Sequence, residues 1–72
     1  GRWEEAGICF ARAVELMPDD VWFWHNLGDA LLQLARWEEA VSAFNRALQL
    51  DPTHQPSREK RTEARRHLDR EE

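Results

Sequence analysis

The chain is poor in the residues that cross-link proteins or carry them into membranes. Its 72 residues include one cysteine, Cys9, so no disulfide can form within the chain. A single cysteine suits a reducing compartment, and we expect a cytoplasmic protein. The longest stretch without a charged residue is 21–28, far short of the roughly 20 apolar residues that span a membrane. We therefore expect no membrane partner.

The sequence also lacks the usual arrangements of catalytic and metal-binding residues. The three histidines are His25, His54 and His67, and none lies in a ligand motif such as H-E-x-x-H. There is no glycine-rich phosphate loop, and no spacing suggests a nucleophile, a base and an orienting group. These absences predict no enzyme activity, no cofactor and no metal.

Charge is unevenly distributed, with a net value of −4. Residues 1–54 contain four arginines and nine acidic residues, whereas residues 55–72 contain six basic and five acidic residues. The basic residues of the tail are mixed with acids and have no aromatic residue among them. Nucleic-acid binding is therefore not expected.

A five-residue stretch, RWEEA, occurs at 2–6 and again at 36–40. When the chain is shifted by 34 residues, ten of the 17 positions in 2–18 match those in 36–52. A period of 20–50 residues indicates stacked structural repeats. The paired glutamates of each copy fit the first turn of a helix, where the helix dipole favours acidic side chains.

Apolar residues recur at helical spacing in three segments, which predicts helices over 2–17, from about 21 to 34, and over 36–50. A proline follows each RWEEA helix, and Asp19 or Asp20 is a suitable N-cap for the middle one. Gly28 is expected to let the facing helix approach closely. Cys9 is expected to be a small buried side chain. If it faces an open surface instead, it can join two chains.

The middle segment resembles the tetratricopeptide repeat family. The family pattern, W-x2-L-G-x2-Y followed by A-x3-F and P, is met here except that leucine replaces the aromatic residue. The matching positions are Trp24, Leu27, Gly28, Leu31, Ala40, Phe44 and Pro52. The resemblance implies an all-α fold of antiparallel helix-turn-helix repeats, as a fragment of an α-solenoid.

The expected organisation has three parts. Residues 1–20 hold the second helix of an incomplete repeat, 21–54 a complete repeat, and 55–72 a polar C-terminal capping helix. The first helix of the incomplete unit is absent. Either the chain is a piece of a longer array, or another copy fills the gap as a swapped dimer or stacked homo-oligomer. The two explanations are compatible.

In this family the first helix of each unit lines a concave groove that holds a peptide or a partner helix. The resemblance therefore implies a protein-interaction module with a peptide or protein partner. Two alternatives stay open: a self-assembling structural repeat, and the docking arm of a larger enzyme. Trp22 is either a binding anchor or packs on the absent helix. The expected peptide-binding residues are Trp22, His25, Asn26, Asp29, Leu32 and Gln33.

Overall fold

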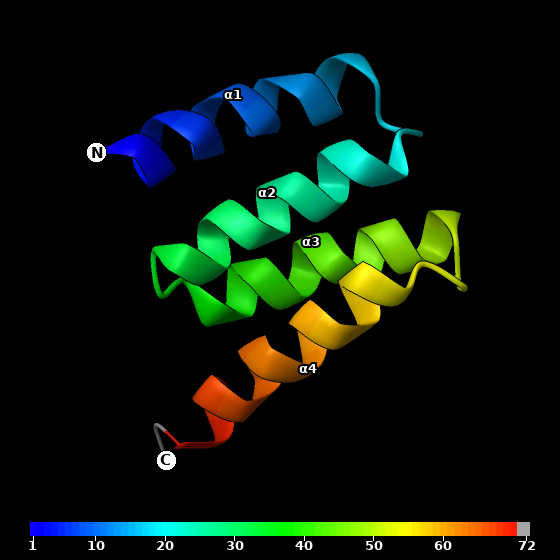
Figure 1. Cartoon of the computed structure of the whole chain (residues 1–72). Helices are drawn as coiled ribbons and strands as arrows, with labels where there is room; N and C mark the ends of the chain where they lie inside the picture. The colour runs from blue at the N-terminus through cyan, green and yellow to red at the C-terminus, as the bar shows by residue number, and fades with distance from the viewer. Residues whose placement is uncertain (71–72) are drawn as a thin grey trace.

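The computed structural model describes residues 1–70, which fold into four consecutive α-helices (Figure 1). The helices are α1 (Arg2–Leu16), α2 (Val21–Gln33), α3 (Trp37–Leu50) and α4 (Gln55–Arg70). Each helix packs against the next one in the chain, and α4 also touches α2. The predicted all-α fold of antiparallel helical hairpins is confirmed.

Local sequence explains where α2 begins and ends. Asp20 is the N-cap, and its carboxylate accepts hydrogen bonds from the backbone N–H groups of Trp22 (2.9 Å) and Phe23 (3.2 Å). At the other end, the chain reverses through Ala35, whose φ of 61° lies in the left-handed region. The Arg36 N–H donates to the Leu31 carbonyl and the Ala35 N–H to that of Leu32. This is the Schellman arrangement, which usually places glycine at the position of Ala35.

The core lies mainly between α2 and α3 and is organised around Phe44, which is fully buried. Its ring lies directly against Gly28: a methyl group built on Gly28 would come within 2.7 Å of the ring. The predicted role of Gly28 in close helix approach is therefore confirmed. Around this contact, the buried cluster contains Leu31, Leu32, Ala40, Ala43 and Ala64.

The two RWEEA helices differ in what covers them. α3 lies between α2 and α4, whereas α1 contacts only α2 among the described helices. Trp37 accordingly packs against the core and stacks on His67, with 4.0 Å between ring centroids, while Trp3 is exposed. Cys9 is also exposed. The prediction that Cys9 is buried is wrong, because no described helix covers its side of α1.

The expected C-terminal helix is present as α4, and the last two residues of the predicted range 55–72, Glu71 and Glu72, lie outside the described residues. This helix buries little apolar surface: its buried side chains are Ser57 and Ala64. A polar contact also joins it to α3, where the Arg61 guanidinium donates to the Asn45 side-chain oxygen (2.8 Å). α4 is thus attached largely through small and polar groups.

The Gly28–Phe44 contact gives a first prediction. Gly28→Ala should lower the free energy of unfolding by about 1–2 kcal/mol, because overpacking outweighs the gain in helix propensity. Gly7→Ala is the matched control: its new methyl group would lie 3.9 Å from the nearest atom, on Ala30. That variant should be stabilised by up to about 1 kcal/mol. Urea denaturation followed by circular dichroism measures both, and equal effects would contradict the packing role of Gly28.

Candidate functional site

The face of α2 expected to bind a peptide is only partly accessible. Trp22 has 56% of its surface exposed, but His25 and Leu32 retain only 8% and 3%. The helical spacing of Trp22, His25, Asp29, Leu32 and Gln33 predicts that they are exposed, with Asn26 beside them, and this prediction is wrong for His25 and Leu32. The reason is that α4 packs on this side of the α2–α3 hairpin. The side chains left accessible are Trp22, Asn26, Asp29 and Gln33, of which Trp22 and Gln33 are the most exposed.

His25 belongs to a buried polar cluster that joins α2 to the start of α4. The fully buried hydroxyl of Ser57 lies 3.0 Å from Nδ1 of His25 and 2.8 Å from Nδ1 of His54. One hydroxyl thus serves both rings, by accepting a hydrogen bond from one Nδ1–H and donating to the other, bare Nδ1. We call these three residues the histidine–serine cluster.

Aromatic rings surround this cluster. The indole of Trp22 meets His54 edge to face at a centroid distance of 4.6 Å, and meets His25 in the same way at 5.6 Å. Phe44 packs against the other side of His25, at 5.6 Å. Trp22 is therefore exposed on one side and held in place on the other. Such a fixed, half-exposed indole loses little conformational entropy when it binds a partner.

The protonation of His25 reflects this packing. Burial is the main cause that lowers the pKa of His25 below its ordinary value of 6.5, followed by repulsion from His54. The carboxylate of Asp29 opposes this shift, while the ammonium group of Lys60 adds to it. His25 is thus held in its neutral form at neutral pH.

Asp29 places a negative charge at the edge of the same face. Its Oδ1 is buried and has no hydrogen-bond partner within residues 1–70, but Nζ of Lys60 lies 3.7 Å away. This spacing gives a loose ion pair between α2 and α4, in which the carboxylate keeps hydrogen-bonding capacity.

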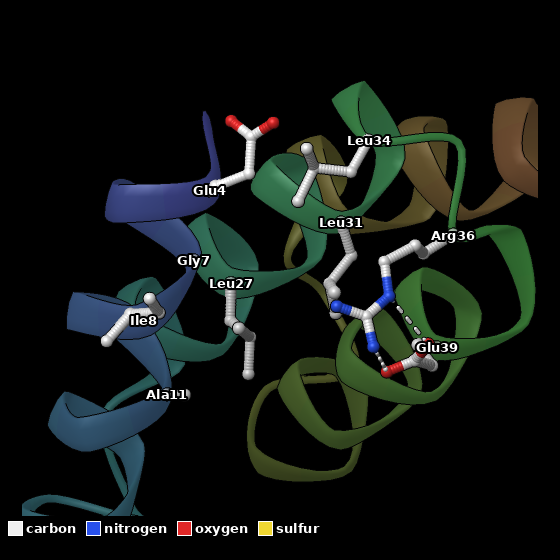
Figure 2. Close-up of a pocket in the computed structure, with 9 residues that line it drawn as sticks. All are labelled: Glu4, Gly7, Ile8, Ala11, Leu27, Leu31, Leu34, Arg36 and Glu39. Carbon is white, nitrogen blue, oxygen red and sulfur yellow. Dashed lines mark hydrogen bonds and ion pairs between the residues drawn. The ribbon is translucent and has the colours of Figure 1, made fainter. Parts of the chain in front are cut away.

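A hollow that the sequence did not reveal lies on the opposite side of α2, between α1 and α3 (Figure 2). It encloses about 430 Å³, and Leu27 and Leu31 of α2 face into it. Successive helical residues turn by about 100°, so these leucines point away from Trp22 and Asp29. The lining residues are Glu4, Gly7, Ile8, Ala11, Leu27, Leu31, Leu34, Arg36 and Glu39.

The rim of this hollow on the α3 side is a surface ion pair. The Arg36 guanidinium donates two hydrogen bonds of 2.8 Å to the carboxylate oxygens of Glu39 (Figure 2). Both side chains are more than half exposed, so the pair adds little stability. On the α1 side, Ile8 is 62% exposed. The hollow is therefore apolar at its base and charged along its edges.

One known protein family matches part of the chain. The family model of the tetratricopeptide repeat matches residues 21–54. Residues 21–54 are a tetratricopeptide repeat. The match begins at the first residue of α2 and ends in the turn before α4, so it takes in the hairpin that holds the Gly28–Phe44 contact. No curated protein is similar enough to the chain to count as a relative.

Knowledge of the family explains the unpredicted hollow. The tetratricopeptide pattern has an aromatic residue where this chain has Leu31. A leucine side chain fills less space than an aromatic ring, and Leu31 lines the hollow. The departure at position 31 was therefore the available sequence signal. The sequence shows that leucine replaces the aromatic residue at position 31, but no hollow was predicted from it.

No described helix is long and apolar enough to cross a membrane. Within residues 1–70, no group of three or more histidine, cysteine or acidic side chains is placed to hold a metal ion.

The histidine–serine cluster gives the second prediction. Ser57→Ala should lower the free energy of unfolding by about 1–3 kcal/mol, because two buried ring nitrogens would lose their shared partner. Ser42→Ala, at an exposed position of α3, should change it by less than about 0.5 kcal/mol. Chemical denaturation of both variants at neutral pH measures the difference. A Ser57 variant as stable as the Ser42 variant would show that the cluster contributes nothing.

Proposed function

We propose that the chain binds a peptide or protein segment through the exposed face of α2. Tetratricopeptide repeats generally mediate protein–protein interactions and are not catalytic, and we infer that this chain has no enzyme activity. The observation that carries the proposal is the half-exposed indole of Trp22, held from behind by His25 and His54. Tryptophan in a fixed position is the residue type most often found at binding hot spots.

The residues around Trp22 favour a particular kind of partner. Asn26 can donate to and accept from a peptide backbone, while Asp29 adds a negative charge at the edge of this face. Gln33 extends the polar edge by another turn of α2. A segment with one large apolar side chain and a nearby basic group matches this surface. His25 and Leu32, being buried, support the surface from below.

We also place this module in the cytoplasm and without a nucleic-acid partner. The only cysteine is an exposed free thiol, which suits a reducing compartment. The excess of acidic residues in 1–54 disfavours contact with a phosphate backbone.

The third prediction concerns Trp22. Peptides selected from a random display library against the immobilised chain should bind Trp22→Ala at least about tenfold more weakly, a hot-spot loss of roughly 1.4 kcal/mol or more. Trp3→Ala is the control, because Trp3 is an exposed tryptophan on α1. It should leave the affinity unchanged. Gln33→Ala tests the Trp22 face of α2 through a second exposed side chain.

Circular dichroism should confirm that the Trp22 variant keeps its helices, because its ring also contacts the histidine–serine cluster. A folded Trp22→Ala chain that binds the selected peptides as tightly as the wild type would refute the proposed surface. So would a selection in which only the Trp3 variant loses affinity.

A second candidate function is self-association through the uncovered side of α1. The comparison between the two RWEEA helices favours it. In α3, Ala40, Ala43 and Ala47 are buried, whereas their counterparts 34 residues earlier, Ala6, Cys9 and Ala13, are half-buried or exposed. We define the open α1 face by Ala6, Cys9, Ala13, Leu16 and Met17, of which Leu16 is 82% exposed.

We infer that a second copy of the chain covers the open α1 face. Small residues in its middle allow another helix to approach closely, and exposed apolar residues at one end add buried area. This homo-oligomer would leave the exposed side of α2 free. Self-association and peptide binding are therefore compatible.

The fourth prediction tests this assembly by light scattering over a concentration series with reductant present. The wild-type chain should show a mass that rises with concentration. Cys9→Lys should shift it towards the monomer, because burying an unpaired ammonium group is unfavourable. Ser42→Lys places the same charge at an exposed position of α3 and should behave like the wild type. A monomer at every concentration would exclude self-association.

A further inference from the structure

The histidine–serine cluster is the main polar junction between α2 and α4. α4 lies mostly against α3 and makes fewer contacts with α2, among them that of Ser57 with His25. Apart from Ser57, the buried side chain of α4 is Ala64. The attachment of α4 to α2 therefore depends on a few buried polar contacts rather than on a broad apolar interface.

One arrangement of hydrogens satisfies both contacts of the Ser57 hydroxyl while the two rings are neutral. If His54 carries its hydrogen on Nδ1, it donates to the Ser57 hydroxyl, which in turn donates to the bare Nδ1 of His25. The Nε2 of His54 is then a bare nitrogen, which suits its place, because it is buried and has no partner within residues 1–70. Each of the two Nδ1–hydroxyl contacts then contains one hydrogen.

Protonation of either ring disturbs this arrangement. A proton on His54 would create a buried N–H at Nε2 without an acceptor, which is costly. A proton on Nδ1 of His25 would remove the acceptor of the Ser57 hydroxyl hydrogen. If both rings were protonated, two positive charges would face each other with ring centroids 5.4 Å apart.

Charged groups on the neighbouring elements do not offset the cost of protonating the histidine rings. Asp29 on α2 attracts a proton to His25, but Lys60 on α4 lies 3.7 Å from that carboxylate and repels the proton. Asp51, in the turn before α4, has its pKa lowered mainly by hydrogen bonds from Thr53 and less by attraction to His54. α3 contributes Phe44, an apolar ring, at the side of His25. Burial therefore decides the balance at His25.

We propose that the histidine–serine cluster is a proton-sensitive latch, which holds α4 against α2 while His25 is neutral and releases it when His25 is protonated. Release would uncover the side of α2 that carries His25 and Leu32, next to Trp22. α4 would thereby control how much of the α2 face a partner can reach. That link to binding depends on the proposed function, whereas the latch itself can be tested without any partner.

The direction of the pH effect follows from His25. Its pKa in the folded chain lies below the ordinary value of 6.5, so the folded state binds fewer protons than the released state in that range. The closed latch is therefore fully favoured above pH 6.5 and loses stability as the pH falls below it. This range is above the pH at which most carboxylates are protonated.

Hydrogen exchange of the wild-type chain tests the latch directly. Amide protection factors, corrected for the intrinsic pH dependence of exchange, should be compared at about pH 7.5 and about pH 5.5, on either side of the histidine range. We expect the protection of α4 to fall several-fold at the lower pH while that of the α2–α3 hairpin is retained. Unchanged protection of α4 would overturn the proposal, and so would an equal loss in all helices.

Variants test whether the histidine–serine cluster causes the pH effect. In the double variant His25→Asn and His54→Asn, amide groups take the place of the two Nδ1 atoms and do not titrate, so the pH-dependent loss in α4 should largely disappear. His67→Asn is the control, because His67 lies on α4 but stacks on Trp37 away from the cluster; it should keep the wild-type loss. A double variant with the full wild-type loss would overturn the proposal. If that variant does not fold, the wild-type exchange experiment still decides.

Discussion

The close contact between Gly28 and the Phe44 ring sets the geometry of the whole chain. Because a methyl group does not fit between them, α2 and α3 approach more closely than most side chains would allow. That approach fixes the orientation of α2 around its own axis. Leu27 and Leu31 then face the hollow between α1 and α3, while helical spacing puts Trp22 and Asp29 on the opposite side of α2. One small residue thus determines which side of α2 faces the hollow.

The repeated sequence predicted the helices well because its physical basis is local. Apolar spacing, the Asp20 cap and the prolines specify where helices run, and the 34-residue period specifies that equivalent helices recur. It could not predict what covers each helix. Cys9 and Ala43 are equivalent in sequence, yet one is exposed and the other is buried, because α3 has helices on both sides whereas α1 has a described helix on one side only.

The candidate site was predicted in outline, but the accessibility of its residues was not. Helical periodicity placed Trp22, His25 and Leu32 on one side of α2, but it carries no information about α4. That helix was expected as a polar cap, and its few apolar residues gave no reason to expect Ser57 to bridge two histidines. Contacts made by a single hydroxyl between distant segments leave no periodic pattern in a sequence.

The central claim is that this chain, in which residues 21–54 are a tetratricopeptide repeat, binds its partner on the Trp22 side of α2 and not in the hollow on the other side. Chemical-shift mapping of the ¹⁵N-labelled chain with a display-selected peptide tests it most directly. The account predicts shifts that centre on the amides and side chains of Trp22, Asn26 and Gln33. Shifts that centre instead on Ile8, Leu31 and Leu34, which line the hollow between α1 and α3, would contradict it.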